Sequence, residues 1–213
     1  MKILIVAATY SEIAPFLNKL SVKGIPDDTI DFEKHQLRFL ITGVGMVATA
    51  YALGTELSKN QYDLAINIGI AGSFSRKLQI GQLVEIDEDI FSELGAEDDE
   101  DFLTLEEMQL GEIRYNSSFK LTENKLTRVR AITVNKVHGN EETIEETIEM
   151  FTPKLESMEG AAFFYACEEA QVSALQIRSV SNYVEKRNKN NWNIPLAVKN
   201  LNDWLPVFLK SLV

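Results

Sequence analysis

Hydrophobic runs and amphipathic stretches alternate along the chain. Residues 2–8 and 64–70 are continuous apolar runs, typical of strands buried on both faces of a sheet. Residues 173–179 predict another strand, and residues 47–57 and 161–170 predict apolar helices. This alternation predicts an α/β fold, a three-layer α/β/α sandwich with a central mixed β-sheet.

Turn and capping signals complete the expected order of elements. Residues 29–33 and 36–42 predict a hairpin, with His35 exposed in its turn. Asn140 is a suitable cap for a helix over residues 141–151. Further strands are expected at residues 81–90 and 130–135, and a last helix is expected from Pro195.

Length and charge limit the possible functions. The 213 residues suit a single domain over residues 1–213, and the formal net charge of −11 argues against nucleic-acid binding. Thirteen acids and no base occur in residues 85–112, so we expect a solvated, mobile flap or insertion around residues 92–112. We expect a cytoplasmic protein without a membrane segment, because Cys167 is the single cysteine and no apolar stretch is long enough to span a bilayer.

The sequence predicts neither a metal site nor a cofactor. His35 and His138 are the two histidines, and neither has a second His or Cys nearby in sequence. Gly43 and Gly45 resemble part of a dinucleotide-binding fingerprint, but Ala48 occupies the position of its third glycine.

Three polar side chains occur where strands end or helices begin. Glu12 follows the first predicted strand, Glu159 precedes the helix at residues 161–170, and Asn182 follows the strand at residues 173–179. Ligands bind at the carboxyl ends of strands in open α/β sheets. Each residue also has an ordinary explanation, since acids complement the helix dipole and asparagine is common in turns.

The chain resembles the nucleoside phosphorylase and nucleosidase superfamily. The similarity extends over nearly the whole chain, in the segments ILIVAATYSEIAPF, TGVGMVATA, INIGIAGSF, ESMEGAA and IRSVSNY, whose order and spacing match that superfamily. The resemblance implies an α/β/α sandwich around a mixed, partly barrel-like sheet. It also implies an enzyme that breaks the N-glycosidic bond of nucleosides.

The resemblance assigns roles to particular residues. Glu12 would activate the attacking nucleophile, Glu159 would bind the ribose hydroxyls, and Asn182 would stabilise the departing base at N7 and O6. Met158 would pack against the sugar. The other residues that the resemblance places at the substrate are Ile70, Gly72, Val137 and His138.

Two features favour hydrolysis over phosphorolysis. Similar phosphorylases carry an arginine at the position of Asn67 and another in the first loop, where residues 8–16 here contain no base. A phosphate nucleophile needs cationic groups, whereas Glu12 would repel phosphate and could deprotonate water. The sequence therefore predicts a nucleosidase, with a purine nucleoside phosphorylase as an alternative.

Asn182 bears on which base is released. Methylthioadenosine nucleosidases are similar but carry aspartate at this position. An asparagine amide has two N–H donors, which match the N7 and O6 acceptors of hypoxanthine. The tail SNYVEKRNKNNWNIPLAVKNL also resembles the hypoxanthine-releasing branch, which acts in menaquinone biosynthesis. The alternatives are a 5′-methylthioadenosine/S-adenosylhomocysteine nucleosidase and a non-catalytic nucleoside-binding protein.

The expected partner is a small nucleoside. Substrates of the hypoxanthine-releasing branch carry an aromatic carboxylate on the 5′ substituent, and Arg76, Lys186 and Arg187 are candidates to contact it. The resemblance also implies a homodimer or a higher homo-oligomer.

Overall fold

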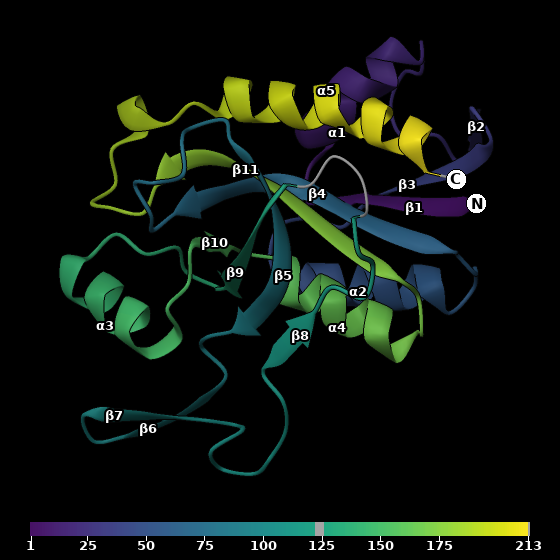
Figure 1. Cartoon of the computed structure of the whole chain (residues 1–213). Helices are drawn as coiled ribbons and strands as arrows, with labels where there is room; N and C mark the ends of the chain where they lie inside the picture. The colour runs from purple at the N-terminus through teal and green to yellow at the C-terminus, as the bar shows by residue number, and fades with distance from the viewer. Residues whose placement is uncertain (122–125, 213) are drawn as a thin grey trace.

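A nine-stranded mixed sheet lies at the centre of the part that the computed structural model describes, residues 1–121 and 126–212 (Figure 1). Its strands are β1 (Lys2–Ala7), β2 (Ile30–Phe32), β3 (His35–Ile41), β4 (Leu64–Ser73), β5 (Leu83–Phe91), β8 (Arg114–Asn116), β9 (Thr127–Thr133), β10 (Leu155–Ser157) and β11 (Ala174–Tyr183). A separate hairpin is formed by β6 (Gly95–Asp98) and β7 (Asp101–Thr104). The helices are α1 (Tyr10–Lys19), α2 (Met46–Leu57), α3 (Glu141–Phe151), α4 (Gly160–Glu169), the 3₁₀ helix η1 (Lys189–Asn191) and α5 (Ile194–Ser211).

The order of strands in the sheet is β10-β9-β5-β11-β4-β1-β3-β2, with β8 beside β5. β1 is parallel to β3 and β4, and β11 is parallel to β4. β5 is antiparallel to β11, so the sheet is mixed. β10 pairs with both β9 and β4 and thereby closes one part of the sheet into a ring. The predicted α/β fold with a central mixed sheet is confirmed.

Two helical layers cover the sheet. Helices α1 and α5 lie on one face, and α2 and α4 lie on the other (Figure 1). Successive side chains of a strand point to opposite faces, so β1 contributes to the hydrophobic cluster on each side of the sheet. Ile5 packs in the cluster that contains Phe16 of α1, and Val6 packs in the cluster that contains Leu53 of α2. Complete burial of such a side chain contributes roughly 1.5–3 kcal/mol. Within the described ranges, no helix is both long and apolar enough to cross a membrane.

Two strands extend beyond their predicted ends. β4 continues to Ser73 and β11 continues to Tyr183, so Asn182 lies within a strand and not in a polar exit turn. The register shifts between Val180 and Asn182, which marks a bulge near the end of β11. No sequence pattern predicted β10, because three residues are too few to show a strand pattern.

The predicted exposure of His35 is wrong. His35 is the first residue of β3 and is only 2% exposed. Its Nε2 lies 3.1 Å from the carbonyl oxygen of Leu209 in α5. The last helix covers the start of this strand, and a prediction from the hairpin alone could not include that long-range contact.

The acidic segment divides between the core and the surface. Glu85 and Asp89 belong to β5 and are buried, whereas every residue of β6 is exposed. The β6–β7 hairpin projects from the body of the molecule (Figure 1). That residues 92–112 act as a mobile flap stays a prediction.

Candidate active site

A hollow of about 570 Å³ opens at the carboxyl ends of β1, β4 and β11. The structure brings every site residue predicted from the sequence to its wall: Glu12, Ile70, Gly72, Val137, His138, Met158, Glu159 and Asn182. These side chains come from segments far apart in the chain, and the parallel strands bring their carboxyl ends to one edge of the sheet. Their roles at a substrate stay predictions.

Glu12 is held firmly at the first turn of α1. Thr9 is the N-cap, and its backbone N–H and its hydroxyl donate to Glu12 Oε2 at 2.9 and 3.0 Å. The backbone N–H of Ile70 donates to Oε1 at 3.2 Å. Glu12 is 7% exposed. Burial raises the pKa of Glu12 above 4.5, although the charge of Arg178 and the hydrogen bonds oppose this rise.

Glu159 lines the same hollow at the entrance to α4, where it is the N-cap. Its Oε1 accepts a hydrogen bond from the backbone N–H of Gly45 at 3.0 Å, and its Oε2 accepts one from Met158 N–H at 3.3 Å. Gly45 has a φ of 98°, which favours glycine and lets its N–H face the carboxylate. The turn before α2 therefore positions the predicted sugar ligand.

Arg178 lies beneath both carboxylates and is 1% exposed. Its Nη2 lies 4.0 Å from Glu159 Oε2, and its charge acts on Glu12. A side chain at Gly69 would overlap the guanidinium, so this glycine lets Arg178 approach the backbone of β4 closely. The site residues predicted from the sequence did not include Arg178. Its place as a charged residue inside the strand predicted at residues 173–179 was the available signal.

A network of buried hydrogen bonds orients Arg178. Its Nε donates to Gln176 Oε1 at 2.9 Å, and Gln176 Nε2 donates to Asp89 Oδ2 at 3.0 Å. Asp89 Oδ1 accepts from the hydroxyl of Thr133 at 2.8 Å. Burial raises the pKa of Asp89 to about 6, despite these hydrogen bonds. A side chain at Gly160 would overlap both Asp89 and Gln176, so the start of α4 packs directly on this network.

Asn182 is oriented by its neighbours. The Ser181 hydroxyl donates to Asn182 Oδ1 at 2.7 Å, and Asn182 Nδ2 donates to the carbonyl of Tyr183 at 3.1 Å. One of the two amide N–H groups is therefore already in use, and one is left for a ligand. The match to both N7 and O6 that the sequence predicted required two free N–H groups.

His138 is anchored through a residue that sequence reasoning missed. Its backbone N–H donates to both carboxylate oxygens of Glu156, at 3.2 and 3.3 Å, and its Nδ1 lies 2.6 Å from Oε2. The hydroxyl of Thr147 in α3 lies 3.0 Å from Nε2. Glu156 also faces the hollow and is 4% exposed. It belongs to β10, which the sequence pattern did not predict.

The candidate contacts for a 5′ substituent separate in space. Arg187 lines the hollow, with its guanidinium 5.1 Å from the ring centre of Trp192. Arg76 instead forms an ion pair with Glu185 and lies over the ring of Tyr183. The hollow's lining does not include Lys186.

Asn67 occupies the strand position where similar phosphorylases carry arginine. It is buried, and its Nδ2 donates to the carbonyl of Val6 at 3.3 Å. It does not line the hollow. In the described part of the chain, no three His, Cys, Asp or Glu side chains gather in a way that could hold a metal ion.

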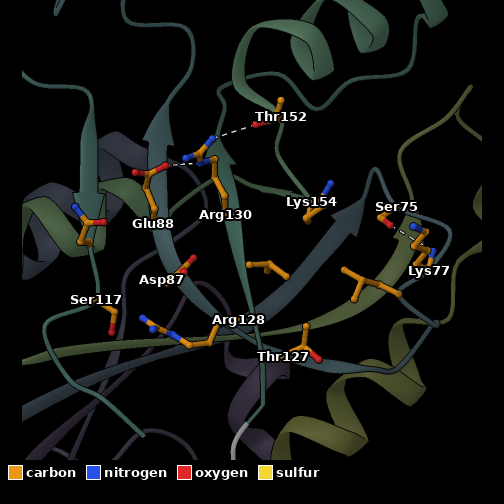
Figure 2. Close-up of a pocket in the computed structure, with 13 residues that line it drawn as sticks. Ser75, Lys77, Asp87, Glu88, Ser117, Thr127, Arg128, Arg130, Thr152 and Lys154 are labelled. Carbon is orange, nitrogen blue, oxygen red and sulfur yellow. Dashed lines mark hydrogen bonds and ion pairs between the residues drawn. The ribbon is translucent and has the colours of Figure 1, made fainter.

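A second hollow, of about 600 Å³, lies beside β5 and β9 (Figure 2). Its arginines are already neutralised, since Arg130 pairs with Glu88 and Arg128 lies 3.3 Å from a carboxylate oxygen of Glu85. None of the residues predicted to act on a substrate lies there. The first hollow is therefore the candidate active site.

Residues 2–210 match the family described as the Phosphorylase superfamily. The chain belongs to that superfamily. It is 30% identical over 172 residues to futalosine hydrolase from Thermus thermophilus, which covers 76% of each protein. It is also 30% identical over 175 residues to futalosine hydrolase from Streptomyces coelicolor, covering 77% of this chain and 74% of that one. Within the superfamily, the chain belongs with these futalosine hydrolases.

Solved structures share the fold over the full chain. A futalosine hydrolase mutant from Helicobacter pylori has a TM-score of 0.85 at 18% identity and 100% coverage of both chains. A 5′-methylthioadenosine/S-adenosylhomocysteine nucleosidase from Helicobacter pylori has a TM-score of 0.83 at 17% identity, with 100% of this chain and 99% of that one covered. The two scores are so close that the fold alone does not separate these activities.

Asp89→Asn tests the buried network through pH. The pKa of Asp89 is about 6 in the folded state against an ordinary 3.8, so this carboxyl favours folding most at low pH, and its contribution is lost as pH rises through 6. The difference corresponds to about 3 kcal/mol. Asparagine cannot ionise. Relative to the wild type, the variant should therefore gain up to about 3 kcal/mol in free energy of unfolding between about pH 4 and about pH 7.

Urea unfolding followed by circular dichroism at each pH measures this difference. Asp101→Asn is the matched control, because Asp101 is exposed in β7. A difference between Asp89→Asn and the wild type that stays constant over this pH range would contradict the assignment.

Proposed function

We propose that this chain is a nucleosidase that hydrolyses the N-glycosidic bond of futalosine. It releases hypoxanthine and dehypoxanthine futalosine, as a step of menaquinone biosynthesis in the cytoplasm. The observation that carries the proposal is the pair of buried carboxylates, Glu12 and Glu159, which line one hollow together with Asn182. The curated relatives named futalosine hydrolase support the choice of substrate.

Glu12 is the general base of this reaction. Its carboxylate takes a proton from a water molecule as the water oxygen bonds to the anomeric carbon of the ribose. A base works best when its pKa is not far below the working pH, and burial raises the pKa of Glu12 in that direction. The hydrogen bonds from Thr9 and Ile70 fix the carboxylate in place, so little reorganisation is needed.

Glu159 binds the sugar. A carboxylate is an acceptor and can take hydrogen bonds from ribose hydroxyls. Gly45 and Met158 use only part of its acceptor capacity. Its negative charge also stabilises the oxocarbenium-like transition state of glycoside cleavage. Met158 lines the same hollow and would pack against the sugar.

Asn182 assists departure of the base. As the N-glycosidic bond breaks, its electron pair moves into the purine, and negative charge develops on N7 and O6. The free N–H of Asn182 Nδ2 can donate to this edge of the base. Hypoxanthine carries negative charge better than adenine does, so it leaves without full protonation by an acid.

Water suits this site better than phosphate does. An anionic nucleophile at the position of the water would meet the carboxylates of Glu12 and Glu159. The segment from Ala8 to Phe16 contributes no cation, and Asn67 is directed to a backbone carbonyl. The charges of the two acids offset that of Arg178, which lies 4.0 Å from Glu159 and acts electrostatically on Glu12.

Arg187 is our candidate for the carboxylate of the 5′ substituent. It lies on the wall of the hollow against Trp192, which offers a flat surface for an aromatic group. Arg76 is already engaged by Glu185.

The test compares two substrates without added phosphate. The wild type should release hypoxanthine from futalosine and little adenine from 5′-methylthioadenosine, measured by chromatography. Release of adenine alone would instead identify a methylthioadenosine-type nucleosidase.

Glu12→Gln should lower kcat by about 10²–10⁴-fold, because an amide does not accept a proton near neutral pH. Glu145→Gln, an exposed change in α3, is the matched control.

The pH profile adds a second readout. Only ionised Glu12 accepts a proton, so kcat of the wild type should fall toward acid with a midpoint above pH 4.5, because burial raises the pKa of Glu12. Near-normal turnover by Glu12→Gln would rule out the role of this residue.

We also propose that the chain forms a homo-oligomer through one face of α2. Val47 and Tyr51 are each 78% exposed, and Val44, in the preceding turn, is 57% exposed. Their spacing places them on one side of the helix. Val44 also lines the hollow, so a second copy on this face would adjoin the substrate. Sedimentation velocity of the wild type should show a dimer or a larger species, and Tyr51→Glu should reduce the fraction of protein in that species. A wild type that sediments as a monomer would exclude the proposed oligomer.

A further inference from the structure

Asn182 alone is a weak selector of the purine. One of its amide N–H groups donates to the carbonyl of Tyr183, so a single N–H is left for the base. Both hypoxanthine and adenine present an acceptor at N7. A second group must therefore distinguish the two bases at position 6 or at N1.

Glu156 lies where such a group is needed. Gly72 of β4 pairs with Glu156 of β10 on one side and with Asn182 of β11 on the other. A Cβ atom at Gly72 would lie 3.5 Å from Glu156 Cγ and 3.3 Å from Asn182 Nδ2. The two side chains therefore flank the same point of the sheet. All three residues line the hollow.

The bare backbone at Gly72 suits a flat ring. Neighbouring strands lie about 4.8 Å apart, so the backbones of Glu156 and Asn182 are roughly 10 Å apart, with Gly72 between them. A purine placed over Gly72 can direct one edge to each side chain. A Cβ atom at Gly72 would also lie only 3.1 Å from Val184 Cγ2, so glycine keeps the backbone free of a side chain between Glu156 and Asn182.

We propose that Glu156 determines specificity by accepting the N1–H of a 6-oxopurine. This inference rests on the proposed function. In hypoxanthine, N1 carries a proton beside the O6 acceptor, so the base offers a donor to Glu156 while N7 or O6 accepts from Asn182. In adenine, N1 is an acceptor, and an acceptor oxygen of the carboxyl group would face its lone pair. Glu156 thus favours one base and repels the other.

His138 positions this carboxylate. Its Nδ1 and its backbone N–H both contact Glu156 Oε2, whereas Oε1 has the backbone contact alone. Oε1 therefore keeps acceptor capacity for the base. Thr147 fixes the far side of the imidazole. A site built to receive an N–H rejects an analogue that lacks it, because a buried polar group is then left unpaired.

The experiment measures kcat/KM for futalosine and for its 6-amino analogue. Glu156→Gln should reduce the preference for futalosine at least tenfold, through a loss on futalosine with no matching loss on the analogue. Glu145→Gln on the surface of α3 should leave the preference unchanged. Equal losses on both substrates would show that Glu156 only supports the fold of the site, and an unchanged preference would also overturn the proposal.

A second measurement uses the wild type alone and so does not depend on the folding of the variant. Hypoxanthine should inhibit the wild type at least tenfold more tightly than 1-methylhypoxanthine, which lacks the N1–H. Equal inhibition of the wild type by the two bases would overturn the proposal. If the wild type does not cleave futalosine at all, the proposed function itself fails, and that outcome is distinct from both results.

Discussion

The buried guanidinium of Arg178 is the interaction on which the site depends. It lies between two carboxylates that face the hollow, Glu12 and Glu159, and it is held from behind by Gln176. Two carboxylates buried close together would otherwise repel each other and favour protonation. Removing one partner of a buried ion pair typically costs about 3–5 kcal/mol, so the cation and the acids stabilise one another. Gly69 provides the space for this arrangement.

The closure of the sheet by β10 is as important for the base side of the hollow as Arg178 is for the two carboxylates. β10 is only three residues long, yet it pairs with both β9 and β4 and brings Glu156 beside Gly72. The bulge near the end of β11 sets Asn182 opposite the same glycine. The sugar side of the hollow thus rests on a buried charge network, and the base side rests on backbone pairing. The loop that contains His138 lines the hollow and is held in place by the contact between His138 and Glu156 of β10.

Much of the fold and of the site could be predicted from local patterns. Buried strands, the cap at Asn140 and the strand-end positions of Glu12 and Asn182 follow from short stretches of sequence. Features that depend on distant segments could not be predicted. His35 is buried because α5 crosses it. Glu156 appears in sequence as one more acid, and its importance comes from β-pairing with strands far away in the chain.

We propose that this site directs water, and not phosphate, to the anomeric carbon of futalosine. Turnover of futalosine in ¹⁸O-labelled water, with and without phosphate, followed by mass spectrometry of the sugar product, tests it directly. We expect one labelled oxygen in dehypoxanthine futalosine, free hypoxanthine, and a rate that does not depend on phosphate. A sugar 1-phosphate product, or no cleavage of futalosine, would show that the site does not carry out this hydrolysis.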